Sequence, residues 1–209
     1  MSITNQKILF LGPSAVALDG FDYSVMDNYD YIARTNFFLH RDDLDEAKNR
    51  CDIIFLNYFS SKHYCLDKID NRLFGKKIFT KTNDEAYILS EKYPESECES
   101  IQDTILEIKE NNDIKVPYIG TSSIFHLIKN YNQVDIAGVD FYLSGFGSDG
   151  KYIEKYPVYC ESNSEQDSHD IKKDMLFLAK IYLLNKGKMN FLHKSKKIID
   201  DFINEKNLL

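Results

Sequence analysis

Short apolar runs that alternate with longer polar or amphipathic stretches are the feature that most constrains the fold of this chain. The runs are rich in Ile, Leu, Phe and Val, which is typical of short strands buried on both faces. Alternation of such strands with helices predicts an α/β fold, a single Rossmann-like domain with a mainly parallel sheet. The predicted strands are Lys7–Leu11, Tyr31–Ala33, Asp52–Leu56, Lys77–Phe79 and Val134–Ala137, and the predicted helices are Asp103–Asn111, Ser123–Asn130 and Ile171–Asn185.

The length of the chain fits one domain with a real core. It has 209 residues, 43% of them hydrophobic, so we expect a single unit over residues 1–209. One long stretch, residues 143–168, is rich in Gly, Ser, Asp and Tyr and has no helical or strand pattern. A loop of this length in a compact domain is typically a lid, a small inserted unit or disordered, and we expect a lid.

The overall charge argues against one class of partner. The net charge is -7, so no positive field is available to bind a nucleic-acid backbone. Neither a signal peptide nor a membrane-spanning run is recognisable, which predicts a soluble, cytoplasmic protein. The four cysteines lack Cys-x-x-Cys spacing and are expected to be free thiols.

The C-terminal stretch His193–Ile203 places lysines beside apolar residues and has two interpretations. It fits a packed terminal helix, and it also fits weak peripheral contact with the inner face of a membrane near a lipid-linked acceptor. Asp200 and Asp201 interrupt the basic cluster and favour the packed helix. The sequence leaves the oligomeric state open, a homo-oligomer included.

Polar residues gather where the predicted strands end. The carboxyl ends of parallel strands meet at one edge of a sheet, where open α/β sheets bind their ligands, so these residues are expected to lie close together. A Gly-Thr-Ser-Ser stretch comes just before the helix predicted at Ser123–Asn130, and its hydroxyls and the first-turn amides are expected to hold an anion there. The stretches are Gly12-Pro13-Ser14, Arg34-Thr35-Asn36, Asn57, Gly120-Thr121-Ser122-Ser123 and Asp140-Phe141-Tyr142.

Each stretch also has a purely structural interpretation. Gly-Pro-Ser after a strand is typical of a turn and a helix start, and one hydroxyl of Thr-Ser-Ser is expected to cap the helix. Asn36 and Asn57 fit loop residues that satisfy the nearby backbone. Convergence on one edge of one sheet favours a binding site, because independent caps need not fall together.

Familiar nucleotide and metal motifs are missing. The chain has no Gly-x-Gly-x-x-Gly after the first strand and no Gly-x-x-x-x-Gly-Lys-Ser/Thr, so a dinucleotide or P-loop site would lack its phosphate cradle. Asp43-Leu44-Asp45 resembles the Asp-x-Asp metal motif of many sugar transferases. Its neighbours, however, are those of a solvated helix face, so we expect no metal.

His169 is the histidine that fits a catalytic role. It stands at the downstream end of the long loop, at the start of the predicted helix, with Asp167 or Ser168 as the expected cap. A neutral histidine there is a candidate general base, and the alternative is a surface histidine in a polar helix start. The other four histidines show no metal-ligand spacing and are assigned no role.

Taken in order, these motifs resemble the bacterial sialyltransferases of glycosyltransferase family 42. The resemblance runs from about Lys7 to about Lys180. It rests on Gly-Pro-Ser after the first strand, Arg-x-Asn-x-Phe after the second, Asn after the third, Thr-Ser at a helix, Gly-Val-Asp-Phe-Tyr (138–142), and a His with Asp five residues later.

The resemblance implies a GT-A-like sheet, a lid and a CMP-activated sialic acid donor used without metal or other cofactor. Gly12, Ser14 and Asn36 would line the nucleotide side, and Asn57, Thr121 and Ser122 would meet the donor phosphate and carboxylate. The implied acceptor is a hydroxyl of a surface glycan or glycolipid, as in lipooligosaccharide or capsule biosynthesis. The further residues of the implied site are Pro13, Ser123, Gly138, Asp140 and Phe141 for binding, and Tyr142 and His169 for catalysis.

The chain departs from the family pattern at three places. Phe10-Leu11 replaces the first two residues of the usual Gly-Asn-Gly-Pro-Ser, and Ser123 replaces a glycine. A second lid tyrosine is expected soon after Tyr142, and Tyr152 and Tyr156 are the candidates. Kdo or another acidic ulosonic sugar therefore stays an alternative to sialic acid. A metal-dependent nucleotide phosphotransferase and a non-catalytic nucleotide-binding or assembly protein are the alternatives from other classes.

Overall fold

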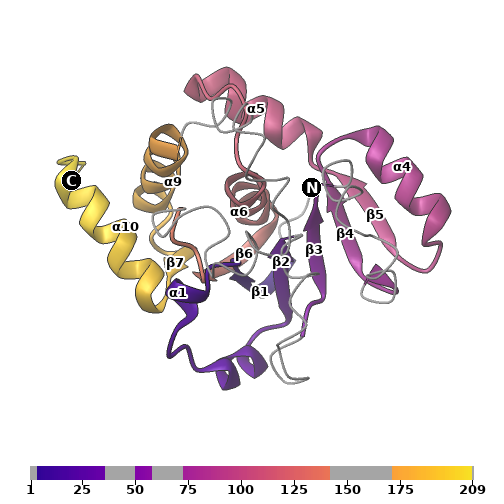
Figure 1. Cartoon of the computed structure of the whole chain (residues 1–209), viewed down its shortest axis with the longest axis horizontal. Coiled ribbons are helices and arrows are strands. Elements are labelled where there is room, and N and C mark those ends of the chain that lie inside the picture. Colours follow the sequence, from indigo (N-terminus) through magenta and orange to yellow (C-terminus); the bar gives the residue numbers. More distant parts are fainter. Residues whose placement is uncertain (1–3, 36–49, 58–72, 142–170, 209) are drawn as a thin grey trace, which may run out of the picture.

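The computed structural model describes residues 4–35, 50–57, 73–141 and 171–208, and within these ranges the chain forms one seven-stranded sheet between helices (Figure 1). All six strand pairs are parallel, and the strand order is β5-β4-β3-β2-β1-β6-β7. The strands are β1 (Thr4–Leu11), β2 (Tyr31–Thr35), β3 (Ile53–Leu56), β4 (Lys77–Thr80), β5 (Glu97–Ser100), β6 (Tyr131–Ala137) and β7 (Met189–Phe191).

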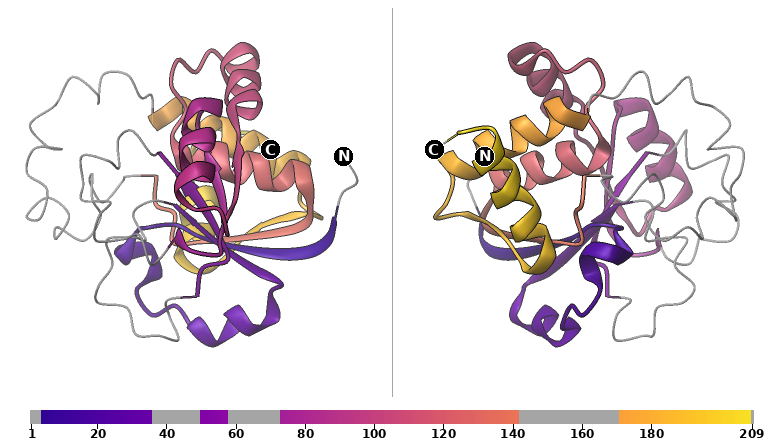
Figure 2. Two further views of the ribbon diagram at one scale, coloured as in Figure 1. Left: turned by 90° about the vertical axis from the view of Figure 1, so that its right-hand side faces the viewer. Right: turned by 60° about the vertical axis from the view of Figure 1, so that its left-hand side comes forward.

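Helices cover both faces of this sheet. In the left view of Figure 2, α5, α6 and α9 lie above the sheet, and the 3-10 helix η1 lies below it. The helices are α1 (Ala15–Leu18), η1 (Tyr23–Asn28), α4 (Asn83–Lys92), α5 (Gln102–Asn112), α6 (Ile119–Asn130), α9 (Ile171–Leu184) and α10 (His193–Glu205).

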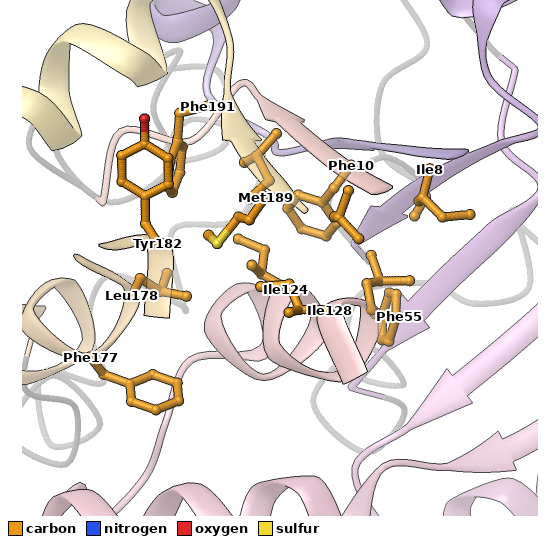
Figure 3. Close-up of a cluster of buried hydrophobic side chains, with 14 of the residues drawn as sticks. Ile8, Phe10, Phe55, Ile124, Ile128, Phe177, Leu178, Tyr182, Met189 and Phe191 are labelled. Atoms are coloured by element: carbon orange, nitrogen blue, oxygen red, sulfur yellow. The ribbon is translucent and has the colours of Figure 1, made fainter. Parts of the chain in front are cut away.

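The main core lies between the sheet and the layer of α5, α6 and α9. Phe10 and Phe55 project from the strands towards α6, and Tyr182 of α9 packs edge-on against Phe191 of β7 (Figure 3). On the opposite face, Leu89 of α4 packs on β3 and β4, and the η1 segment packs on β1, β2 and β6. Alternate residues of the central strands therefore reach two different cores, which explains why the strands are almost wholly apolar.

α10 packs along the β7 edge of the sheet. Ser195, Ile199 and Ile203 are its buried residues. On its outer side the lysines pair with aspartates one turn on, Lys196 with Asp200 and Lys197 with Asp201. This agrees with the packed terminal helix predicted for His193–Ile203. None of the described helices has the length and apolar character that crossing a membrane requires.

The five predicted strands and three predicted helices are present, with ends shifted by a few residues. Further elements, among them η1, α4, β5 and β7, were not predicted. β5 is an edge strand in which Glu97 and Glu99 alternate with smaller residues, and β7 has three residues, so neither carries a long apolar run. α6 begins at Ile119 and not at Ser123 as predicted.

β1 is the switch point of the sheet. Strands β2 to β5 extend from one side of β1, and the chain then returns to place β6 and β7 on the other side. In open α/β sheets, ligands bind outside the carboxyl ends of the strands at such a point. The segments after β1 and β6 are therefore the first places to look for a functional site.

Candidate active site at the carboxyl edge of the sheet

The first turn of α6 lies at the carboxyl edge of the sheet. α6 ends at Asn130 and β6 begins at the next residue, so the helix must run back along the sheet to deliver the chain to the start of a parallel strand. Its 12 residues span about 18 Å, which places its amino end towards the edge where β1 and β6 finish. The predicted Gly-Thr-Ser-Ser stretch is thus on the expected edge.

Two glycines let the segments after β1 and β6 touch. The Gly12 amide donates to the Ala137 carbonyl at 2.8 Å, and the Ser14 amide donates to the Gly138 carbonyl at 3.0 Å. A Cβ on Gly12 would lie 2.3 Å from the Gly138 carbonyl oxygen. Gly12 is therefore required by close backbone packing, whether or not it also borders a nucleotide.

Ser14 begins the short helix α1. Its side chain is buried, and Oγ accepts a hydrogen bond from the Ala17 amide at 3.1 Å. This is the helix-start role that the sequence also allowed for Gly-Pro-Ser. Pro13, between the two, is partly exposed. A contact of Ser14 with nucleotide stays a prediction.

The segment after β6 is held in an unusual backbone shape. Gly138 has a φ of 71° and Phe141 a φ of 54°, both in the left-handed region. The Val139 amide donates at 2.9 Å to Oγ of Ser195, a fully buried residue of α10. Asp140 is buried, and the Phe141 ring joins the main core beside Phe191. The predicted binding residues Gly138, Asp140 and Phe141 thus have a clear part in shaping this turn.

The three hydroxyl residues of the Thr-Ser-Ser stretch lie inside α6 and do not precede it, which corrects the predicted cap. Tyr118 occupies the N-cap position and makes no side-chain capping bond. Thr121, Ser122 and Ser123 are all buried, and Ser123 Oγ donates back to the Ile119 carbonyl at 2.5 Å.

Ser122 is the residue of this stretch whose polar atom is unaccounted for. Its Oγ is fully buried and has no hydrogen-bond partner in the part of the chain that the structure describes. Buried hydroxyls are normally satisfied, so an unmatched one next to a helix start calls for an explanation. A ligand oxygen at the first turn of α6 would supply a partner.

Among the described residues, Asn57 is the polar residue that follows β3 at this edge, whereas Arg34 and Thr35, predicted to follow the second strand, are the last residues of β2. Asn57 is partly exposed. Arg34, in β2, is buried, and its Nε donates to the Arg50 carbonyl at 3.1 Å. Arg50 in turn binds Asp52 and the carbonyls of Met26, Tyr29 and Asp30. The two arginines therefore join the strands to the η1 segment, on the face of the sheet opposite α6.

Several predicted residues lie outside the described residues. They are Asn36, Tyr142, Tyr152, Tyr156 and His169, together with the predicted lid at 143–168, the Asp43-Leu44-Asp45 motif and two of the four cysteines, Cys65 and Cys160. Their roles at the site therefore stay predictions.

His126, which was assigned no role, lies on α6 and packs against aromatic residues of the main core. Its ring lies 4.6 Å from the Phe79 ring and 6.0 Å from the Phe55 ring, centroid to centroid. Nδ1 lies 3.1 Å from Thr104 Oγ1 of α5. Burial, with smaller effects of Lys129 and Lys77, lowers the pKa of His126 to about 4, so the ring is neutral at physiological pH.

The two described cysteines, Cys51 and Cys98, are free, as predicted. Cys51 is buried against β3, and burial raises the pKa of its thiol to about 12. Such a thiol is inert at neutral pH. Among residues 4–35, 50–57, 73–141 and 171–208, no group of three or more His, Cys, Asp and Glu side chains is placed to hold a metal ion.

No protein-family model matches the sequence, and no curated protein matches it significantly. Solved structures do match the fold. One is the sialyltransferase CstII from Campylobacter jejuni in complex with the substrate analogue CMP-3FNeuAc, with a TM-score of 0.62 and 18% identity over 91% of this chain and 83% of that chain. Another is the α-2,3-sialyltransferase from Campylobacter jejuni in apo form, with a TM-score of 0.59 and 17% identity over 94% and 78%.

A third match is the sialyltransferase CST-II in complex with trisaccharide acceptor and CMP, with a TM-score of 0.55 and 19% identity over 91% and 82%. The chain has the fold of these bacterial sialyltransferases. This confirms the predicted α/β class with a Rossmann-like, GT-A-like sheet, and it agrees with the family resemblance stated from the motifs. Identities below 20% establish the fold and leave the activity to be argued from the site.

Two contacts that hold this edge together were not predicted from the sequence, although Asp174 is the Asp five residues after His169 in the motifs of the family resemblance. Ser195 binds the segment after β6, and Asp174 of α9 accepts a hydrogen bond from the Tyr118 amide at 3.1 Å. Their partners lie 56 positions away in both cases. Such long-range contacts leave no periodic or local signal in a single sequence.

Proposed function

We propose that the protein is a glycosyltransferase that moves sialic acid, or a related acidic ulosonic sugar such as Kdo, from a CMP-sugar donor to a hydroxyl of a surface glycan or glycolipid. The observation that carries the proposal is the match of the fold, over 91% of the chain, to a sialyltransferase with a CMP-sugar analogue bound. The motifs that resemble this family fall, where they are described, at the carboxyl edge of the sheet.

The first turn of α6 is the proposed place for the donor phosphate and the sugar carboxylate. The amides of residues 119–121 precede the first bond within the helix, from the Ser122 amide to the Tyr118 carbonyl at 3.0 Å. Amides in this position, at the positive end of a helix, bind anions. Thr121, Ser122 and Asn57 would add polar contacts, and Ser122 Oγ would gain the partner that it lacks among the described residues.

The nucleotide is proposed to lie along the segment after β1, against Gly12, Ser14 and Asn36. The backbone contacts of Gly12 and Ser14 with Ala137 and Gly138 would keep this segment fixed when donor binds. A rigid, preformed edge lowers the ordering cost of binding.

The chemistry would be a single inverting displacement. His169 would accept the proton of the acceptor hydroxyl as that oxygen attacks the anomeric carbon, and CMP would leave with the bonding electrons. Tyr142 and Tyr156, with Tyr152 as the alternative, would donate hydrogen bonds to the departing phosphate. Residues 143–168 would close over the donor and exclude water. Tyrosine donors would serve in place of the metal that many diphosphate leaving groups need, so no metal is proposed.

The test of this function is a transfer assay with CMP-sialic acid and, separately, CMP-Kdo, using a panel of glycan and glycolipid acceptors, with products and donor hydrolysis measured by mass spectrometry. His169→Ala should abolish transfer and leave CMP affinity near that of the wild type. Tyr142→Phe should lower turnover by roughly one to three powers of ten. Turnover by His169→Ala at the wild-type rate would remove the base from the mechanism, and transfer of neither sugar would argue for a non-catalytic nucleotide-binding protein.

A further inference from the structure

The helix that carries the proposed donor residues begins without a cap of its own. In a self-contained helix start, the N-cap side chain accepts from the N3 amide and the N3 side chain accepts from the N-cap amide. In α6 the N-cap position holds Tyr118, whose side chain makes no such bond, and the N3 position holds Thr121 in place of a Glu or Gln. Neither half of this arrangement is therefore supplied by α6 itself.

Asp174 of α9 supplies one half from outside the helix. Its Oδ1 accepts the hydrogen bond of the Tyr118 amide at 3.1 Å, and the bond is buried. Asp174 is 1% exposed, so its carboxylate is shielded from water. A carboxylate at this end of a helix is favoured by the partial positive charge of the first turn, and a bond to an ionised acceptor is stronger than a neutral one.

Lys173, the residue before Asp174, contacts the carboxyl end of α5, where the connection from α5 to α6 begins. Lys173 Nζ donates to the Asp113 carbonyl at 2.9 Å and to Asp113 Oδ2 at 2.7 Å, at the carboxyl end of α5. A positive group thus meets the end of α5 and a negative group meets the start of α6, and each matches the partial charge of that helix end. The first turn of α9 thereby holds the α5–α6 connection at both of its ends.

The two contacts are unequal in strength. The Lys173 and Asp113 side chains are 42% and 90% exposed, so water and salt screen their attraction. The Asp174 bond is buried and cannot be replaced by water without opening the core. Of Lys173 and Asp174, Asp174 is therefore the residue on which the position of α6 depends.

We propose that Asp174 is a positioning residue for donor binding: by capping α6 from α9, it fixes the first turn on which Thr121 and Ser122 lie. This inference rests on the proposed function for its effect on CMP, whereas the capping contact itself does not. Because Asp174 takes the Tyr118 amide, the amides of Ile119, Gly120 and Thr121 are the ones left for an anion. The role is one of geometry, so an uncharged acceptor of the same shape should preserve it.

The experiment compares Asp174→Asn with Asp174→Ala in the full chain. Asparagine keeps an oxygen acceptor for the Tyr118 amide, and alanine removes it. We expect Asp174→Ala to raise the Kd for CMP and to lower kcat/KM for the donor about 100-fold, the scale of a misplaced binding group. Asp174→Asn should stay within about threefold of the wild type.

Glu85→Ala is the matched control. Glu85 is also 1% exposed and caps a helix start, that of α4, through the Thr82 amide at 3.0 Å, but α4 carries no proposed donor residue. It should lower stability and leave the Kd for CMP unchanged. Should Asp174→Ala not yield folded protein, Asp174→Leu, which also lacks an acceptor and fills more of the buried space, takes its place in the comparison.

Amide hydrogen exchange separates this inference from the proposed function. In Asp174→Ala the amides at the start of α6 should exchange at least tenfold faster, with no change in α4, and Glu85→Ala should give the reverse pattern. Unchanged exchange at Tyr118 in Asp174→Ala would overturn the capping role, whatever ligand the protein binds. Wild-type affinity for CMP in Asp174→Ala, or equal losses in Asn and Ala, would overturn the positioning role. Absence of CMP binding by the wild type would instead refute the proposed function.

Discussion

Two helices of this protein, α4 and α6, begin with the same unpaired backbone amides and satisfy them from different places. In α4, Thr82 Oγ1 accepts from the Glu85 amide at 3.2 Å, and Glu85 Oε2 accepts from the Thr82 amide at 3.0 Å, so residues three positions apart complete the cap. In α6 the corresponding carboxylate comes from Asp174, 56 positions from Tyr118. The cap of α4 is made by residues close together in the sequence, whereas the cap of α6 forms only when α9 packs beside it.

The same contrast separates two parts of the sheet. At the carboxyl ends of β1 and β6, Gly12 binds Ala137, and Val139 binds Ser195 of α10. On the β5 side, the polar contacts span fewer positions, such as that of Lys77 of β4 with Glu97 of β5, 20 positions away. The edge proposed to bind the donor is therefore held by contacts between distant segments, and damage to any of them should be felt across it.

The largest expected effect follows from placing a methyl group between the two touching segments. In Gly12→Ala the new Cβ would lie 2.3 Å from the Gly138 carbonyl oxygen, and backbone cannot yield as a side chain can. We expect a loss of about 3 kcal/mol in the free energy of unfolding, measured by urea denaturation. Gly120→Ala is the control, because nothing lies within 4 Å of its added Cβ inside α6, and it should stabilise the protein by about 0.5 to 1 kcal/mol. Equal stability of Gly12→Ala and the wild type would contradict the close contact.

A second effect, of similar size, concerns the middle of α6. The pKa of His126 is lowered from 6.5 to about 4, chiefly by burial, so the unfolded chain binds this proton more readily than the folded one. Above about pH 6.5 the ring is neutral in both the folded and the unfolded chain and costs no stability. As the pH falls towards 4, protonation favours the unfolded chain, so the free energy of unfolding decreases, by about 3 kcal/mol at most. The difference in unfolding free energy between the wild type and His126→Gln should therefore shrink between pH 7 and pH 4. A constant difference over this range would show that the ring is protonated without penalty.

Removing the contact between α10 and the segment after β6 should have a smaller effect. Ser195→Ala leaves the Val139 amide without the acceptor that lies 2.9 Å from it, at a cost of about 1 to 2 kcal/mol. Ser90→Ala is the matched variant on α4, where the hydroxyl donates to the Tyr87 carbonyl on the surface, and it should change stability by less than about 0.5 kcal/mol. Thermal unfolding of both variants tests the contrast, which fails if they lose the same stability.

The smallest expected effect is on the surface of α10. The side chains of Lys197 and Asp201 are 78% and 62% exposed, so their ion pair is screened by water. Lys197→Ala should alter the free energy of unfolding by less than about 0.5 kcal/mol, and the change should vanish in 0.5 M NaCl. A larger, salt-independent loss would assign Lys197 a packing role.

Sequence reasoning located the strands that form the core because their apolar runs are long enough to recognise. It missed α4, although the Thr82–Glu85 pair is the capping-box signal, because the helix is only weakly amphipathic. It missed β5 because an edge strand with Glu97 and Glu99 facing solvent has no apolar run. These two elements lie in the half of the sheet away from the proposed site, whereas β7, which was missed because it has three residues, lies beside β6.

The start of α6 was misplaced for a different reason. The Thr-Ser-Ser stretch has the composition of a cap, and the rule for caps placed the helix start at Ser123. The chain instead begins the helix at Ile119, since Asp174 satisfies the Tyr118 amide from another helix. Phe141 likewise follows a strand as predicted, but the contact of its ring with Phe191 could only be known from the fold.

The most direct test of the account is a calorimetric titration of the full chain with CMP in EDTA, followed by CDP, UDP and ATP with and without magnesium. We expect selective binding of CMP without metal, which would justify the comparison of CMP-sialic acid with CMP-Kdo. Binding of ATP or UDP alone, and only with magnesium, would contradict it and favour a metal-dependent nucleotide phosphotransferase.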